Sequence, residues 1–459
     1  MSLQHLVRDY APGVVHNAAI SVFNYLQYRK RHGGEYDKWQ RYFATWRTRS
    51  AEAWQREQEK RLGEFMRYVL RESPYFREKY AGVEVSTLDA LRQLDVMSKT
   101  ELIQHVDQIR TVSPNNGIRS DTGGTTGNSL TIYFTPENMQ ERFGLLRAFR
   151  GEYGYKLGKP SAWFSGKELL SARDIRNGIY YKDDYLQRIR YFSTFHITER
   201  TFSDYWRALT QQKPRFLFGF PSSVVDLCRL AKQHGQRADF PVSAFFSTSE
   251  VVTQADRQLV EEVLGCRIVD QYASAEGAPF ILQCRSGRYH LNPLTGVFEV
   301  VDGQLNPTRE GELLVTSFTT RGVPLVRYRI GDRVVLSDLS QCECGCHYPI
   351  VERIEGRDQD YAINDVGARV SAVNISNCSK HVEGVTRFQL EQHTRGEVFV
   401  SVEANERFNN EQREHLTDAL RERLGEQTRI HLTEVDRIPR AASGKFRVVI
   451  NRLPESERL

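Results

Sequence analysis

The chain has 459 residues, of which 40% are hydrophobic and 26% are charged, a composition typical of a globular protein with two or three domains. Its net charge of +5 is too small to indicate nucleic acid as the main partner. No apolar run approaches the roughly 20 residues that span a bilayer, and residues 1–9 lack the pattern of a secretory signal. Seven cysteines are too few for a disulfide framework, so we expect a cytoplasmic protein with reduced thiols.

The first 80 residues are predicted to form a helical extension. Apolar residues recur at mixed spacings of three and four over residues 14–31 and 36–71, and Ser73-Pro74 ends the pattern. A basic cluster, Arg29-Lys30-Arg31-His32, closes the first of these segments. Such a cluster most often marks a solvated helix end, and contact with a membrane surface or a partner is the alternative.

A polar loop follows at residues 120–129, where six of ten residues are glycine or threonine. Such a run cannot pack a core, but its hydroxyl and backbone N–H groups can surround phosphate oxygens. It has neither the Gly-Lys-Ser/Thr of a P-loop nor the GxGxxG spacing of a dinucleotide fingerprint. The sequence predicts a phosphate loop before a strand over residues 130–135, with a flexible surface turn as the alternative. The loop residues are Thr122, Gly123, Gly124, Thr125, Thr126 and Gly127.

Residues 213–272 repeat a pattern of strand, turn and helix. Strands are predicted over 213–222, 245–250 and 266–272, with helices over 223–233 and 253–264. This alternation argues for an α/β domain with a largely parallel sheet, whose ligands bind beyond the carboxyl ends of the strands. That topology brings four polar side chains near one another: Ser249, Glu250, Tyr272 and Glu276.

The sequence pattern changes twice in the last part of the chain. Alternating residues over 297–301, 311–317 and 326–336 predict an antiparallel β unit. Beyond residue 356 the pattern suits a small α+β domain, with strands near 370, at 397–403 and at 429–435 and a helix at 410–424. This domain ends in a Gly- and Ser-containing run at residues 437–447.

Five motifs stand in one order along the chain. They are Thr122-Gly123-Gly124-Thr125-Thr126-Gly127, Gln271-Tyr272-Ala273-Ser274-Ala275-Glu276, Tyr328-Arg329-Ile330-Gly331-Asp332, Gly356-Arg357-Asp358-Gln359-Asp360 and the run at 439–447. With these motifs the chain resembles the adenylate-forming superfamily of acyl-CoA synthetases, adenylation domains and luciferases. Residues 71–77, 219–222 and 324–329 are similar to its phenylacetate–CoA ligase-like branch, which includes capsule-biosynthesis adenylating proteins.

The resemblance implies an α/β fold with two main parts. A large multi-subdomain N-terminal domain would hold parallel sheets and the late β unit, and a small mobile α+β domain would follow. The expected boundaries are 1–80 for the helical extension, 81–356 for the adenylating core and 357–459 for the C-terminal lid. The implied activity has two half-reactions: a carboxylic acid attacks ATP to give an acyl-adenylate and pyrophosphate, and a thiol, often coenzyme A, then displaces AMP.

The resemblance also implies roles for the nucleotide-site residues. The Thr/Gly loop would hold the β and γ phosphates of ATP, and Tyr272 would offer a flat ring for adenine. Glu276 is a hard oxygen ligand suited to Mg²⁺, and Asp332 suits a pair of ribose hydroxyls. Outside the family context, Tyr272 would be read as a core residue and Asp332 as a turn residue. The remaining nucleotide-binding positions are Ser249, Glu250, Ala273, Ser274 and Arg357, the last reaching the ribose or phosphate.

Lys445 is the residue expected to carry most of the catalysis. A carboxylate that attacks the α-phosphate brings two anions together, and a lysine between them would offset the charge that builds in the transition state. The alternative interpretation is that Lys445 is an exposed lysine in a C-terminal basic patch. In the family the small domain pivots between the half-reactions near the position of Asp358, so Lys445 would serve only the first.

A cysteine cluster predicts a structural zinc site. Cys284-x5-His290 and the run Cys342-Glu343-Cys344-Gly345-Cys346-His347 supply the residue types of a tetrahedral Cys₃His site. The branch resemblance implies Cys284, His290, Cys342 and Cys344 as the ligands. Cys346 departs from the branch pattern and leaves the choice among the late cysteines open. Free thiols are the alternative.

The substrates are less defined. The family layout implies an acyl pocket that includes His196, Gly219, Ser222 and Phe246, although His196 is equally compatible with a packed core histidine. These residues do not identify the carboxylic acid. The expected acceptor of the acyl group is coenzyme A, a carrier-protein thiol or a sugar in polysaccharide biosynthesis. Asn128 stands where the superfamily commonly has a lysine, which removes one cation near the phosphates. The alternative function is a catalytically silent nucleotide-binding regulatory or assembly protein, and a homodimer is compatible with either.

Overall fold

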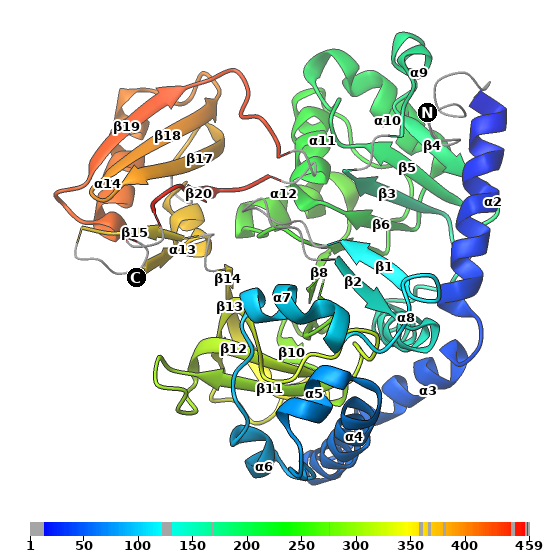
Figure 1. The fold of residues 1–459 in the computed structure, drawn as a ribbon. Coiled ribbons are helices and arrows are strands. Elements are labelled where there is room, and N and C mark those ends of the chain that lie inside the picture. The colour runs from blue at the N-terminus through cyan, green and yellow to red at the C-terminus, as the bar shows by residue number, and fades with distance from the viewer. Residues whose placement is uncertain are drawn as a thin grey trace.

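The computed structural model describes residues 13–121, 131–166, 169–274, 276–357, 361–365, 369–379, 382–441, 446–454 and 457. A large sheet covered by helices makes up most of the molecule, and a small separate sheet lies near the C-terminus (Figure 1). The described helices before the first strand are α2 (Gly13–His32), α3 (Tyr36–Trp46), α4 (Ala51–Glu72), α5 (Pro74–Lys79), α6 (Leu88–Arg92) and α7 (Lys99–Ile109). Within the described ranges, no helix combines the length and the apolar character that a membrane span needs.

The predicted helical segment over residues 36–71 is divided in two. α3 ends at Trp46, and α4 begins at Ala51. Ser50 sets the new start, because its hydroxyl accepts the backbone N–H of Ala53 at 3.3 Å and so caps the helix. Apolar residues continue on both sides of this break, so their spacing does not locate it.

Twelve strands form the large sheet, in the order β11-β12-β13-β14-β10-β9-β8-β7-β6-β3-β5-β4. Neighbours from β5 through β3, β6 and β7 to β8 all pair in parallel, which confirms the predicted parallel sheet. The strands are β3 (Ser161–Ser165), β4 (Tyr181–Asp184), β5 (Ile189–Ser193), β6 (Phe216–Gly219), β7 (Ala244–Ser247), β8 (Ile268–Ala273), β9 (Phe280–Gln283), β10 (Tyr289–Leu291), β11 (Gly296–Val301), β12 (Glu310–Ser317), β13 (Tyr328–Leu336) and β14 (Ile350–Arg357).

β8 joins the two halves of this sheet. It pairs in parallel with β7 and antiparallel with β9, so the late antiparallel β unit continues the parallel sheet. The sheet therefore changes from parallel to antiparallel pairing at β8, the strand that carries Tyr272. Ligand sites in α/β sheets favour such a position at the carboxyl ends of strands.

Helices cover both faces of the parallel half. Alternate residues of β6 and β7 point to opposite faces: Leu217 and Phe245 pack with α10–α12, whereas Phe218 and Phe246 pack with residues of α3 and α8. These strands, buried at every position, are typical of a sheet covered on both faces. The helices are α8 (Pro136–Gly151), α9 (Ala172–Arg176), α10 (Phe202–Gln212), α11 (Pro221–Gln233) and α12 (Gln254–Leu264).

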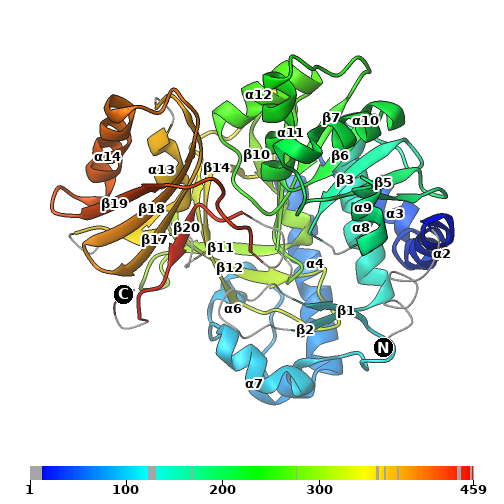
Figure 2. The ribbon, with the colours of Figure 1, turned by 90° about the horizontal axis from the view of Figure 1, so that it is seen from above.

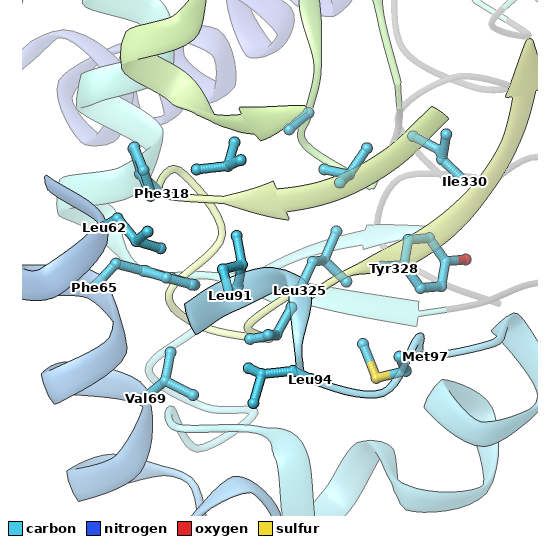
Figure 3. Packing of buried hydrophobic residues seen from close by; sticks show 14 of the residues in the cluster. Leu62, Phe65, Val69, Leu91, Leu94, Met97, Phe318, Leu325, Tyr328 and Ile330 are labelled. Atoms are coloured by element: carbon cyan, nitrogen blue, oxygen red, sulfur yellow. The ribbon is translucent and has the colours of Figure 1, made fainter. Parts of the chain in front are cut away.

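The helical extension packs on the antiparallel half. Leu62, Phe65 and Val69 of α4 face Phe318 and Leu325 in a fully buried cluster that fixes the first helices to the sheet (Figure 3). Nearby, β1 (Ile118–Asp121) and β2 (Thr131–Phe134) form a hairpin in which Asp121 pairs with Thr131. The strand predicted over 130–135 is confirmed, and the Thr/Gly loop between β1 and β2 lies outside the described residues.

The C-terminal unit, here the described residues 361–457, has its own sheet and core. The sheet order is β19-β18-β17-β20, and this unit lies beside the large sheet (Figure 2). It confirms the predicted strands near 370, 397 and 429 and the helix at 410–424, and adds β17, which was not predicted. The elements are β15 (Tyr361–Ile363), β16 (Arg369–Ser371), α13 (Ala372–Ser376), β17 (Val385–Thr394), β18 (Glu397–Ala404), α14 (Asn410–Leu424), β19 (Arg429–Glu434) and β20 (Val449–Asn451).

Candidate active site

Tyr272 and Asp332 meet at the junction of the two halves of the sheet. The Tyr272 hydroxyl, on β8, donates a hydrogen bond to the carboxylate of Asp332, on β13. Asp332 is buried and pairs with Arg357 of β14 in the strand register. The structure therefore brings three predicted nucleotide-binding positions together. Asp332 lies within a strand, so its interpretation as a turn residue is wrong, whereas Tyr272 is partly buried against the core.

The Glu276 segment is a buried, tightly bonded loop. The Ser274 hydroxyl donates to the carbonyl of Ala278 at 2.6 Å, and the Thr319 hydroxyl donates to the carbonyl of Gly277 at 3.0 Å. Gly277 has φ +107°, and a Cβ there would lie 2.6 Å from Nη1 of Arg142. Glycine is thus required at position 277, where the loop backbone passes so close to this guanidinium.

Arg142 gives the Glu276 loop a buried positive charge. Its guanidinium lies 4.3 Å from the centre of the Phe134 ring, on the strand that follows the Thr/Gly loop. Burial lowers the pKa of Arg142 to about 10, and the carboxylates of Glu141 and Glu276 oppose that shift. Arg142 therefore remains charged at neutral pH.

Glu250 connects the core to the C-terminal unit. Its carboxylate accepts the backbone N–H of Ser222 at 2.9 Å, at the first turn of α11, and the backbone N–H of Phe446 at 2.7 Å. Burial raises the pKa of Glu250, and the two N–H groups and Arg440 favour the charged form. Ser249 beside it is exposed with φ +71°, a left-handed conformation that is uncommon outside glycine and is concentrated at functional sites.

Asp226 of α11 is the centre of an ionic cluster between the core and the C-terminal unit. Its carboxylate accepts from Arg387 of β17, from Nη2 of Arg440 at 2.7 Å and from Nη1 of Arg229 at 3.0 Å. Burial alone would raise the pKa of Asp226, but the three guanidinium groups outweigh it and lower the pKa to about 2. We call Asp226, Arg387 and Arg440 the arginine latch.

The latch lies beside the predicted acyl-pocket residues. Arg440 also donates to the hydroxyl of Ser222, and Arg437 donates to the carbonyl of Phe195 at 3.4 Å, next to His196. The ring of Phe446 lies 4.7 Å from the guanidinium of Arg387. Arg440 and Phe446 are therefore both held against the core, at Ser222, Asp226 and Glu250.

The predicted acyl-pocket residues do not all gather in one place. Gly219 ends β6 with φ +121°, and a Cβ there would overlap the carbonyl oxygen of Phe164. His196 is half-buried, and its Nδ1 lies 2.8 Å from the Ser193 hydroxyl. Phe246 is fully buried in an aromatic cluster on the α3–α8 face, where it stacks on Phe218 at 5.3 Å. Phe246 is thus a core residue in this arrangement.

Several predicted site residues fall outside the described structure. These are Thr122, Gly123, Gly124, Thr125, Thr126, Gly127, Asp358 and Lys445. For Arg357 only the backbone position in β14 is described. Lys445 comes directly before Phe446 in sequence, and Phe446 lies against Glu250 and Arg387.

The predicted zinc ligands form one compact cluster. Potential ligand atoms of Cys284, His290, Cys342 and Cys344 all lie within 4.8 Å of one another. Sγ of Cys284 is 3.8 Å from Sγ of Cys342, and Sγ of Cys344 is 3.4 Å from Nε2 of His290. A tetrahedral zinc with sulfur at about 2.3 Å would hold ligand atoms roughly 3.8 Å apart, so the set fits the ion.

The surroundings of this cluster also suit a metal. Nδ1 of His290 lies 3.2 Å from the carbonyl of Tyr348, so its N–H can donate there while Nε2 faces the cysteines. Cys346 is buried among apolar residues and lies outside the four-residue group. The geometry thus selects Cys342 and Cys344 among the three late cysteines.

Solved structures with this fold are acid–CoA ligases. A 2-hydroxyisobutyryl-CoA ligase in the postadenylation state, in complex with an acyl-AMP, matches with a TM-score of 0.71 over 88% of this chain and 91% of that chain, at 17% identity. The same ligase in the thioesterification state gives a TM-score of 0.56 at 18% identity, over 89% of this chain and 91% of that chain. The chain has the fold of the adenylate-forming ligases.

The sequence relatives point to one branch of that superfamily. Residues 363–452 match the family model of the CapK C-terminal domain. Protein CapK of Staphylococcus aureus is 28% identical over 405 residues, which cover 86% of this chain and 89% of that protein. The resemblance to the adenylate-forming superfamily and its capsule-biosynthesis branch is confirmed.

Proposed function

We propose that this protein activates a carboxylic acid with ATP and then transfers the acyl group to a thiol, with coenzyme A as the expected acceptor. The observation that carries the proposal is the meeting of Tyr272, Asp332 and Arg357 at one point of an adenylate-forming fold. A buried carboxylate hydrogen-bonded to a tyrosine at a strand junction suits a nucleoside, because the carboxylate accepts from ribose hydroxyls beside a flat ring.

In the first half-reaction, a carboxylate oxygen of the acid attacks the α-phosphorus of ATP. The bond from that phosphorus to the bridging oxygen breaks, and pyrophosphate leaves with the electron pair. Bound Mg²⁺, with Glu276 as a ligand, would neutralise phosphate charge. Lys445 would stabilise the anionic transition state between the acid and the α-phosphate, and the Thr/Gly loop would hold the β and γ phosphates.

In the second half-reaction, a thiolate attacks the acyl carbon and AMP leaves. We propose that the C-terminal lid, from residue 357 onward, turns near Asp358 between the two steps. The arginine latch would hold the lid in the adenylation arrangement while its contacts at Ser222 and Glu250 shield the adenylate from water. The branch resemblance favours an acyl product used in polysaccharide biosynthesis.

The cysteine cluster is proposed as a structural zinc site. Four protein ligands would leave no open coordination position, so the ion would be structural and not catalytic. It would fix the β9–β10 hairpin, which carries Cys284 directly after β9 and His290 within β10, to the segment 342–344.

Replacing Cys342 with serine is expected to remove the zinc and lower the melting temperature, because three remaining ligands bind zinc far more weakly. Metal analysis of purified protein and thermal unfolding measure both effects. Cys346→Ser is the matched control and should retain one zinc per chain. Equal zinc loss in both variants, or no zinc in the parent protein, would contradict the assignment.

The proposed function is tested by ATP–pyrophosphate exchange against a panel of aryl, short aliphatic, hydroxy and amino acids. Acid-dependent exchange with one of them is expected, since only a reversible adenylation returns labelled pyrophosphate to ATP. A protein that binds ATP, seen as a shift in melting temperature, but shows no exchange across the panel would fit a nucleotide-binding regulatory protein instead.

A further inference from the structure

Helix α2 lies at the rim of the molecule beside β4 (Figures 1 and 2). Nδ2 of Asn17 donates to the Tyr185 hydroxyl at 3.0 Å, and the Ser21 hydroxyl accepts the backbone N–H of Tyr185 at 3.0 Å. Nδ2 of Asn24 donates to Asp184 at 2.9 Å. The helix therefore uses its polar face to attach to the β4–β5 turn.

The outward face of α2 is apolar. Val15, Ala18, Val22 and Leu26 recur at spacings of three and four and are exposed, with exposed fractions of 52% for Val15, 56% for Val22 and 54% for Leu26. Leu186 in the β4–β5 turn is also exposed, at 60%. A surface helix normally shows the reverse polarity, and contiguous exposed apolar residues mark interaction sites. We call Val15, Ala18, Val22 and Leu26 the rim patch.

The charged residues beside the rim patch favour one kind of partner. The last turn of α2 is Arg29-Lys30-Arg31-His32, and the helix contains no acidic residue. Arg29 continues the outward stripe, and Arg29 and Lys30 are exposed. Apolar side chains beside flexible cations suit a surface that is apolar inside and anionic outside. In a second copy, α2 would offer no acidic side chain to these cations.

We propose that the rim patch binds the surface of a bilayer that contains anionic lipids. Val15, Val22 and Leu26 enter the boundary between headgroups and acyl chains, and Arg29 and Lys30 contact lipid phosphates. The helix lies in the interface and does not span the bilayer, in agreement with its basic last turn.

Flotation of the full-length protein with vesicles tests the proposal. Binding is expected to mixed phosphatidylglycerol–phosphatidylcholine vesicles, and less to pure phosphatidylcholine vesicles. The double variant Val22→Glu, Leu26→Glu should bind the mixed vesicles about tenfold or more weakly, since it replaces inserted apolar groups with charges that anionic lipids repel. Arg29→Gln, Lys30→Gln should lose the preference for phosphatidylglycerol, and high salt should have the same effect.

The matched control is Val83→Glu, Leu339→Glu, which changes the same residue types at exposed positions elsewhere. It should bind vesicles as the parent protein does. Absence of vesicle binding by the parent protein would overturn the proposal. So would a dimer, measured by light scattering, that the Val22→Glu, Leu26→Glu variant alone dissociates, because the patch would then bind a second copy.

Discussion

Replacing Lys445 with alanine is expected to slow adenylate formation by about 10²–10³-fold, the usual cost of removing a group that stabilises transition-state charge. Thioester formation from a supplied acyl-adenylate and coenzyme A should keep its rate, since Lys445 would serve only the first half-reaction. Single-turnover measurements of the two steps separate these effects.

Lys38→Ala is the matched control for that variant, because Lys38 is an exposed lysine that pairs with Glu35 on the surface. It should leave both half-reactions unchanged. If Lys445→Ala slowed the two steps equally, or neither, Lys445 would have no specific part in adenylation.

Replacing Asp226 with alanine is expected to undo the docking of the C-terminal unit. It removes the carboxylate that the nearly buried guanidinium groups of Arg387 and Arg440 share, while Arg387 keeps a longer contact with Glu403 at 3.6 Å. Removing one partner of a buried ion pair commonly costs about 3–5 kcal/mol, which corresponds to roughly 100-fold or more in an equilibrium. Adenylation should therefore slow by about tenfold or more. Thioester formation should not slow, because it needs the other arrangement of the lid.

Asp89→Ala is the control for the latch variant, since Asp89 forms an exposed pair with Arg92.

The pH dependence of docking gives a second check on the latch. The folded pKa of Asp226 is lowered to about 2, so its contribution is present above its ordinary pKa of about 3.9 and is lost only as the pH falls toward 2. The proposed role of the latch would be contradicted if Asp226→Ala slowed both half-reactions equally. It would also be contradicted if the C-terminal unit of the parent protein lost its docking near neutral pH.

Local sequence pattern was sufficient for the parallel half of the sheet. β6 and β7 are short, mostly apolar runs followed by helices with clear starts, and such segments are recognised without tertiary information. β17 escaped prediction because its inward side chains include polar groups. The buried amide of Gln392 bonds both the N–H and the carbonyl of Ile363 at 2.7 Å, so the strand lacks a clean apolar alternation.

The candidate site, too, could be predicted from the sequence only in part. Tyr272, Glu276 and Asp332 were predicted because they belong to sequence motifs, and so were the four residues of the cysteine–histidine cluster. The arginine latch was not, because Asp226, Arg387 and Arg440 are far apart in sequence and each is an ordinary surface residue by pattern. Only Arg440 lay in a recognised motif, and its contact with Asp226 spans 214 positions of the chain. Contacts between separate parts of a fold leave no local signal.

The most direct test of acid activation is to follow oxygen from the substrate. With the acid found in the exchange panel carrying heavy oxygen in its carboxylate, the acyl-adenylate mechanism predicts that one labelled oxygen appears in AMP when the thioester forms. Mass spectrometry of the AMP measures this. Unlabelled AMP, or formation of ADP and phosphate in its place, would show that the carboxylate never bonded to the α-phosphorus and would contradict the account.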